Sequence, residues 1–184
     1  MPATVQVVPG TFTLVSFDAS EIARLVADVA GKVGITDGAI RVEVDQSVPL
    51  TMSKVTPGDP IVLWVEGGAF EDPRYIRQLS PQAVQTVAAR LLTRVADRRT
   101  PAFAAAPADD ELTVPQTDAW DVWALGRASR RGIPVNQQRW RYRFRNRHGF
   151  TDAADRVFDQ LWAADLLTWP DLLARCAETA VLSR

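Results

Sequence analysis

The chain has 184 residues, a hydrophobic content of 47% and a net charge of −1. That length and composition are typical of a globular chain of one ordinary domain or slightly more, long enough to bury a core. A net charge so near zero does not by itself predict a polyanionic partner. Nearly all the basic charge is arginine, with Lys32 and Lys54 the only lysines, and together with abundant alanine this indicates a GC-rich coding sequence.

The expected compartment is the cytoplasm. Cys176 is the only cysteine, so an internal disulfide is excluded, and we expect this thiol to be buried or inert. Residues 1–6 lack the basic start and long apolar core of a signal peptide. No apolar run approaches the roughly 18 residues of a membrane helix, so we expect no membrane partner.

The N-terminal part predicts two strands, at residues 4–8 and 12–17, joined as a hairpin by the turn dipeptide Pro9-Gly10. Asp18 then begins a helix with helical apolar spacing, and Gly34 ends it.

Two further strands follow. Residues 40–45 alternate strictly between apolar and polar, the pattern of a strand with one buried face. Residues 48–55 form a weaker candidate, and Pro49 inside them favours the edge of a sheet.

The centre of the predicted fold is a strand at residues 61–65, apolar enough to be buried on both faces, and a helix at residues 81–97. Gly67-Gly68 ends the strand, and Ser80-Pro81 begins the helix. The residues that lie mainly outside the apolar face of this helix are polar: Gln85, Arg90, Thr93, Arg94 and Asp97.

These elements predict an α+β fold: a small mixed sheet with two helices against one face and one βαβ crossover, followed by a Trp-rich helical part. The expected division is a sheet domain at 1–98, a Pro/Ala linker at 99–116 and a helical domain at 117–184. About four helices are expected in the last part, which holds five of the six tryptophans. Their expected N-caps are Thr117, Asn136, Thr151 and Thr168.

Residues for catalysis or metal binding are scarce. His148 is the only histidine, so a zinc site of the HExxH type is excluded; we expect no metal and no cofactor, and we expect this histidine to be solvated or in a helix-terminal turn. Gly67-Gly68 is a tight turn rather than a phosphate-binding loop. Glu66, Glu71 and Asp72 follow the central strand, where ligand sites often lie, although a solvated loop is the favoured explanation. No catalytic residue is therefore assigned.

An alternating strand at 40–45, a strand after Gly58-Asp59-Pro60 and a long helix from Pro81 stand in an order that resembles the compact zincin-like metallopeptidase domains of bacteria. In that family the long helix carries HExxH and binds the catalytic zinc. The helix of this chain has neither His nor Glu there, so no ligand position carries over. The resemblance covers roughly residues 40–98 and implies at most a scaffold that has lost the activity.

One segment departs from an ordinary globular sequence. Residues 127–148 hold eight arginines and no acid, which leaves the rest of the chain at −9. As a helix, 136–148 would place Arg139, Arg143 and Arg147 in one row, and Arg141 and Arg145 in another; as a strand, all five would share one face. The Asn136 start and the Gly149 stop favour the helix. The candidate partner-binding residues are Arg139, Trp140, Arg141, Arg143, Phe144, Arg145 and Arg147.

Several kinds of partner remain for these arginines, among them an anionic ligand other than those that follow. Aspartates in the flanking helices could absorb the charge within the chain, or an acidic protein surface or a second copy could do so. Nucleic acid is the alternative, since guanidinium groups near aromatic rings suit phosphates and stacked bases. The leading hypothesis is a non-catalytic binding or assembly protein that contacts an acidic surface.

Overall fold

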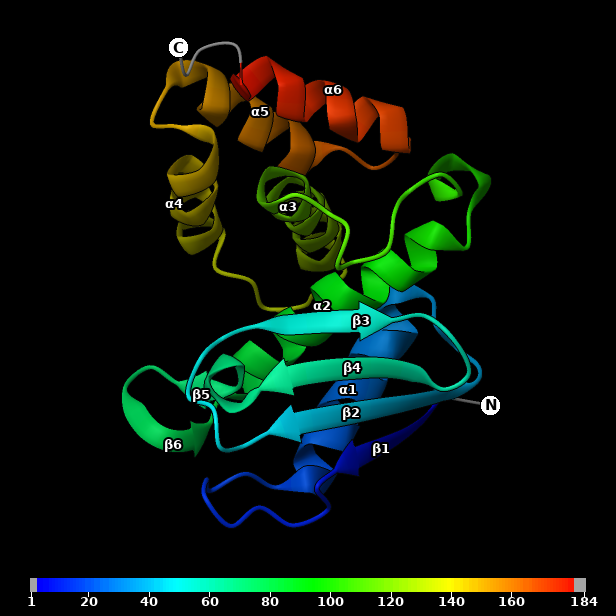
Figure 1. The fold of residues 1–184 in the computed structure, drawn as a ribbon, viewed down its shortest axis with the longest axis vertical. Coiled ribbons are helices and arrows are strands. Elements are labelled where there is room, and N and C mark those ends of the chain that lie inside the picture. The colour runs from blue at the N-terminus through cyan, green and yellow to red at the C-terminus, as the bar shows by residue number, and fades with distance from the viewer. Residues whose placement is uncertain (1–2, 181–184) are drawn as a thin grey trace. The chain divides into compact units, whose positions relative to one another are not determined.

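The computed structural model describes residues 3–180, which form two compact units divided after Ala96. The first unit is a mixed sheet with helices, and the second is wholly helical (Figure 1). This is the α+β fold that the sequence predicts. Residues 181–184 of the predicted helical domain lie outside the described residues.

The sheet of the first unit has four strands in the order β1-β2-β4-β3. β1 (Thr4–Val8), β2 (Ala39–Asp45) and β4 (Ile61–Glu66) are parallel, whereas β3 (Ser53–Thr56) runs antiparallel to β4 at the edge. The edge position is as predicted, but the strand is shorter than the predicted 48–55, and Pro49 lies outside it. The predicted βαβ crossover is present, because α1 (Ala19–Val33) connects the adjacent parallel strands β1 and β2. α1 lies behind the sheet in Figure 1.

Local sequence explains the limits of α1. The Asp18 carboxylate accepts the N–H groups of Ser20 and Glu21 at 2.8 and 3.3 Å, and Gly34 ends the helix with a φ of 89°. A positive φ is strained for residues with a side chain, so a glycine at this position has a structural reason.

The predicted hairpin of residues 4–8 with 12–17 is wrong. β1 pairs with β2, and the second segment forms only an isolated parallel bridge between Ser16 and Gln78. The local turn signal at Pro9-Gly10 is present, but β1 gains more by joining a buried sheet than by pairing in an exposed hairpin. The bridge reaches β6 (Tyr75–Leu79), which with β5 (Glu71–Asp72) forms a small antiparallel ladder that the sequence did not predict.

The central strand β4 is less buried than expected. Ile61, Leu63 and Val65 are buried, but Val62 and Trp64 on the opposite face are only half-buried. The ammonium of Lys54 lies 5.3 Å from the centre of the Trp64 ring, so a charged side chain partly covers this face of the strand.

Gly67-Gly68 begins a short 3₁₀ turn, Gly67–Ala69. A Cβ on Gly68 would lie 2.3 Å from the carbonyl oxygen of Pro49 and 2.5 Å from that of Leu50. Gly67 and Gly68 therefore form a tight turn, in which the backbone at Gly68 packs directly on the backbone of residues 49–50.

α2 (Pro81–Arg98) begins where the sequence predicts, with the Ser80 hydroxyl accepting the N–H of Ala83 at 3.2 Å. Its polar side is nevertheless buried at Arg90, Thr93, Arg94 and Asp97. Periodicity separated these residues from the apolar face correctly, but it could not reveal that they are also removed from solvent.

Residues 99–116 belong to the second unit, where they form a packed loop rather than an extended spacer. A short 3₁₀ turn, Pro101–Phe103, inserts the buried Phe103 ring against Trp123 at 5.1 Å between centres. Arg98 holds the loop by donating to the carboxylate of Asp109 and to the carbonyl of Pro107, both at 2.8 Å. Composition alone, rich in Pro and Ala, gave no sign of this anchoring.

Four α-helices follow, as predicted: α3 (Val114–Arg130), α4 (Gln137–His148), α5 (Asp152–Ala163) and α6 (Trp169–Ala180). The predicted N-cap Thr117 is wrong: α3 is capped four residues earlier, because Thr113 and Gln116 form a capping box. It contacts the other three helices, and nearly all of its middle turns are buried. Its core partners are mainly aromatic: Phe103, Phe144, Phe158 and Trp169.

α3 and α5 approach closely at Gly126. A Cβ on this glycine would lie 2.2 Å from the carbonyl oxygen of Trp162. The end of α5 is further held by α3, since Arg130 donates to the Trp162 carbonyl at 2.6 Å and the Trp123 indole donates to the Ala164 carbonyl at 3.2 Å. Within residues 3–180, no helix is both long and apolar enough to cross a membrane.

Candidate partner-binding surface

The arginine-rich segment is a helix, not a strand. The Asn136 side chain accepts the N–H of Arg139 at 3.0 Å, and Gly149, with a φ of 98°, follows the last turn. α4 contains no acidic residue. The arginines consequently find their partners on other helices, and those partners separate them into two rows.

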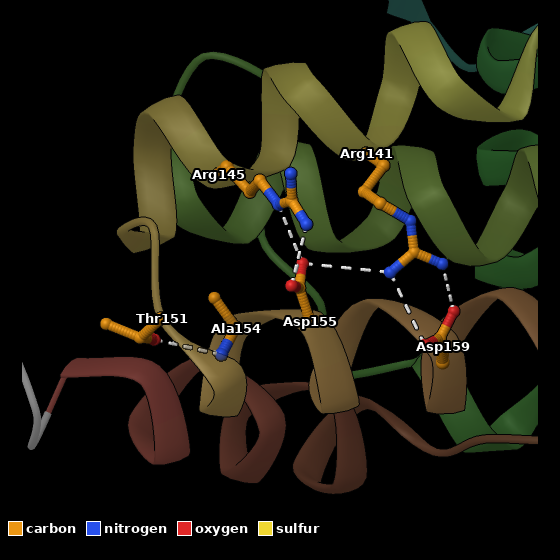
Figure 2. A network of polar contacts seen from close by, with 6 residues as sticks. All are labelled: Arg141, Arg145, Thr151, Ala154, Asp155 and Asp159. Carbon is orange, nitrogen blue, oxygen red and sulfur yellow. Dashed lines mark hydrogen bonds and ion pairs between the residues drawn. The ribbon is translucent and has the colours of Figure 1, made fainter.

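The inner row, Arg141 and Arg145, faces α5. Figure 2 shows the two guanidinium groups directed at the carboxylates of Asp155 and Asp159. Arg145 donates twice to Asp155, at 2.8 and 2.7 Å, and Arg141 lies 3.7 Å from Asp155 and pairs with Asp159. The hydrogen bonds from Arg145 hold the pKa of Asp155 below its usual range.

The geometry of α5 presents these carboxylates as one row. Thr151 caps the helix by accepting the N–H of Ala154 at 3.1 Å, as predicted (Figure 2). Asp155 and Asp159 are four residues apart, so they lie on the same side and match Arg141 and Arg145, which have the same spacing. Two positive and two negative charges leave the inner row neutral.

The outer row consists of Arg139, Arg143 and Arg147. Arg143 donates through Nε to Asp118 of α3 at 2.9 Å, and Nε of Arg147 lies 3.5 Å from the other oxygen of the same carboxylate. The side chains of Arg143 and Arg147 remain 44% and 53% exposed, whereas that of Asp118 is 2% exposed. Arg139 is exposed and makes no ion pair within residues 3–180.

Among residues 3–180, Asp118 is the only carboxylate that forms an ion pair with the outer row, and it balances the row incompletely. Oδ2 is buried and accepts no hydrogen bond from residues 3–180. Burial raises the pKa of this carboxyl group, and the charge of Arg143 opposes that rise. Arg143 and Arg147 share this one buried acid and Arg139 has no ion pair among the described residues, so the outer row keeps an excess of positive charge at the surface.

The two predicted aromatic contacts differ in access. Phe144 is 1% exposed and stacks on His148 at 3.9 Å between ring centres, so it is a core residue that a surface partner does not reach. Trp140 is half-buried, with the Arg143 guanidinium 5.0 Å from its ring centre.

Two aromatic residues that the sequence reasoning missed are exposed beside the outer row. Tyr142 is 60% exposed and Phe150 is 63% exposed, and their rings meet edge to face at 5.9 Å. A helical projection would have placed Tyr142, three residues after Arg139, on the edge of the outer row that faces Arg145 of the inner row. Phe150 lies beyond the end of the helix, and no periodicity predicts its position.

His148 lies in the last turn of α4, one of the two positions expected for it, but it is buried rather than solvated. Its Nδ1 lies 2.7 Å from the Thr179 hydroxyl, and its Nε2 lies 3.1 Å from the Pro115 carbonyl oxygen. Burial lowers the pKa of this imidazole. Nearby Cys176 is partly buried, and burial raises the pKa of its thiol to about 11, which fits the expected inert cysteine.

The carboxylates that follow the central strand do not form a common site. Glu66 is buried and accepts the N–H of Met52 at 2.7 Å, while Asp72 pairs with Arg74 at 3.2 Å. Among residues 3–180, no group of three or more His, Cys, Asp or Glu side chains could hold a metal ion.

The sequence did not predict the buried role of Asp97. Its carboxylate accepts two hydrogen bonds from Arg127, at 2.8 and 2.7 Å, and one from the Trp120 indole at 2.8 Å. Its donors come from α3, more than twenty positions along the chain. This carboxylate anchors the core of the second unit.

Comparisons with known proteins add no assignment. A scan against protein-family models gave no matching family, and searches of curated proteins and of solved structures gave no match. The resemblance to zincin-like domains therefore stays an expectation from element order.

Proposed function

We propose that this protein is a non-catalytic binding protein that contacts an acidic partner surface through the outer row of α4. The observation that carries the proposal is the unequal charge balance of the two arginine rows. Asp155 and Asp159 neutralise the inner row, whereas the outer row has three guanidinium groups and one buried carboxylate. Attraction to an anionic partner is concentrated where positive charge is left uncompensated.

Pre-organisation supports the same proposal. Asp118 pairs with Nε of Arg143 and with Nε of Arg147, and both arginine side chains remain about half exposed. An arginine already restricted in this way loses less conformational freedom when a partner binds, so less of the binding free energy is spent on ordering it. The expected compartment, the cytoplasm, contains acidic proteins and nucleic acids alike.

The spacing of the row sets the size of the contact. Arg139, Arg143 and Arg147 stand four residues apart, so their Cα atoms span about 12 Å along the helix at a rise of about 1.5 Å per residue. A partner must therefore present negative charge along a line of roughly that length. Direct contact between the α4 helices of two copies is disfavoured because like charges would meet; a second copy could only offer an acidic face.

The test uses polyglutamate, a polypeptide with negative charge along its length, and follows its binding by fluorescence anisotropy at low salt. The double variant Arg139→Gln/Arg147→Gln should bind more weakly than the parent protein and with a smaller dependence on salt. Arg143 is kept in this variant so that Asp118 retains its hydrogen bond.

The matched control is Arg99→Gln/Arg156→Gln, which removes the same charge at two exposed arginines that make no ion pair within residues 3–180. Equal weakening by the two double variants would mean that only net charge matters, and the assignment to α4 would be withdrawn. If the acidic surface belongs to a second copy, sedimentation will show self-association that the α4 variant alone reduces.

A further inference from the structure

We infer that the acidic partner of the outer row is a single-stranded nucleic acid, whose bases stack on Tyr142 and Phe150 while its phosphates pair with Arg139, Arg143 and Arg147. This inference rests on the proposed function and names its partner. It is carried by two exposed aromatic rings, 60% and 63% accessible, which contact each other. Tyr142 follows Arg139 of the outer row by three residues on α4, so these two side chains are neighbours on the helix surface.

The surroundings of the rings favour bases over a protein surface. The core of a protein–protein interface is depleted of charged side chains as a class, although aromatic residues and arginine are themselves enriched there. Here the exposed neighbours on α4 are polar: Gln138, Arg139 and Asn146. Rings interleaved with guanidinium and amide groups instead match the stacking platforms of proteins that bind single strands.

The perpendicular arrangement of the rings suits unstacked bases. Tyr142 and Phe150 meet at 71°, so they cannot offer one continuous platform, and each presents its own surface to solvent. Every nucleobase has a π face, and therefore such contacts tolerate any sequence. The exposed amide of Asn146, which can donate and accept, adds a group for a base edge.

Charge outside α4 argues against a duplex. Without the five arginines of α4 the chain carries −1 minus 5, or −6, against −1 for the whole. A duplex, with one negative charge per about 1.7 Å of its axis, would be repelled more strongly by that remainder than a single strand of lower charge density. A duplex also keeps its bases stacked inside, where the two rings cannot reach them.

The experiment measures anisotropy of a short labelled oligothymidylate, the duplex of the same length and labelled polyglutamate. The protein variants are Tyr142→Ala, Phe150→Ala, Arg139→Gln and the control Arg156→Gln. Since both rings are more than half exposed, the aromatic variants should keep the thermal unfolding of the parent, and the scan is run on every sample.

We expect the oligothymidylate to bind better than the duplex. Each aromatic variant should lose about 5- to 150-fold in affinity for it, the equivalent of one stacked base. Polyglutamate has no bases, so its binding should not change in these variants. Arg139→Gln should lower the slope of log affinity against log salt by about 0.7, one phosphate contact on a single strand, whereas Arg156→Gln should not.

The outcomes separate the two proposals. Polyglutamate binding that depends on Arg139, with no binding of oligothymidylate or no effect of the aromatic variants, would leave the proposed function standing and overturn the nucleic-acid inference in favour of an acidic protein. Tighter binding of the duplex would also overturn it. Binding of none of the three probes at low salt would contradict both.

Discussion

Asp118 is the buried carboxylate on which two exposed arginines of α4 converge. It accepts one hydrogen bond, from Arg143, and lies 3.5 Å from Nε of Arg147. A buried charge that loses its hydrogen-bond donor destabilises a fold more than an exposed pair does. The three arginines of the outer row should therefore respond differently to the same substitution, although the sequence shows them as equivalent.

Arg143→Gln should lower the free energy of unfolding by about 1–3 kcal/mol, because it leaves the Asp118 carboxylate without its hydrogen bond. Arg139→Gln, at an exposed arginine with no ion pair in the described residues, should leave stability unchanged. Urea unfolding of both variants measures the difference. Equal stability of the two variants would show that the Arg143–Asp118 contact adds nothing to the fold.

The buried imidazole of His148 gives a pH dependence of known sign. Its pKa is lowered in the folded state relative to the ordinary value of 6.5, so the unfolded chain binds a proton more readily. The contribution of this group to stability is full above about pH 6.5 and is lost as the pH falls toward the lowered folded value.

We therefore expect the free energy of unfolding to fall on acidification below about pH 6.5 more steeply in the parent protein than in His148→Gln, whose side chain does not titrate. Urea titrations between pH 5 and about pH 7.5, a range around the ordinary histidine pKa, compare the two. Parallel pH profiles would show that His148 has the same proton affinity in both states.

At the scale of elements, α3 packs against α5 through small and polar side chains as well as through tryptophan. Gly126 lets the α5 backbone approach, and Arg130 and Trp123 then satisfy carbonyl groups at the end of α5. Helices that approach this closely leave no room for a methyl group between them.

Gly126→Ala should accordingly destabilise the protein by about 3 kcal/mol, the upper end of the usual range for overpacking, since its Cβ would lie 2.2 Å from a backbone oxygen that cannot rotate away. Gly31→Ala is the matched control: it too lies in a helix, and its Cβ would have no neighbour within 4 Å. The control should be neutral or stabilise by up to about 1 kcal/mol, because alanine is the better helix former. Thermal and urea unfolding report both, and a tolerated Gly126→Ala would refute the close approach of α3 and α5.

Local signals predicted the helices better than the strand pairing. Asp18, Asn136 and Thr151 cap helices as predicted, because a cap is a contact between residues two or three positions apart. The pairing of residues 12–17 was predicted wrongly, because it depends on competition with β2, more than twenty residues away. The two arginine rows followed from helical spacing, but which row is neutralised depends on aspartates from α3 and α5, and spacing within one helix does not contain that information.

At the scale of the whole molecule, the segment 99–116 shows how composition can mislead. Its Pro and Ala content predicts a spacer, yet Phe103 is buried among Trp120, Trp123 and Trp169. An aromatic ring in the core ties the surrounding loop to the second unit. A spacer would be cut early by a protease. Here the buried Phe103 ring should protect the segment from early cleavage.

Phe103→Ala should cost about 3–5 kcal/mol of stability, the usual range for a buried phenylalanine, and should open the loop. Limited proteolysis of the native proteins provides the readout: residues 99–116 should be cut early in the variant and late in the parent. A parent protein whose first cuts fall in this segment would show that the loop is a spacer after all.

The central claim is that the outer face of α4 is where the protein meets a polyanion. Its most direct test is the slope of log affinity against log salt for oligothymidylate, measured for the parent and for Arg139→Gln/Arg147→Gln. Two phosphate contacts predict a slope smaller by about 1.4 in the variant, at about 0.7 for each contact on a single strand. A slope that is the same in the parent and the variant would contradict the claim, because the charge that drives binding would then lie elsewhere on the molecule.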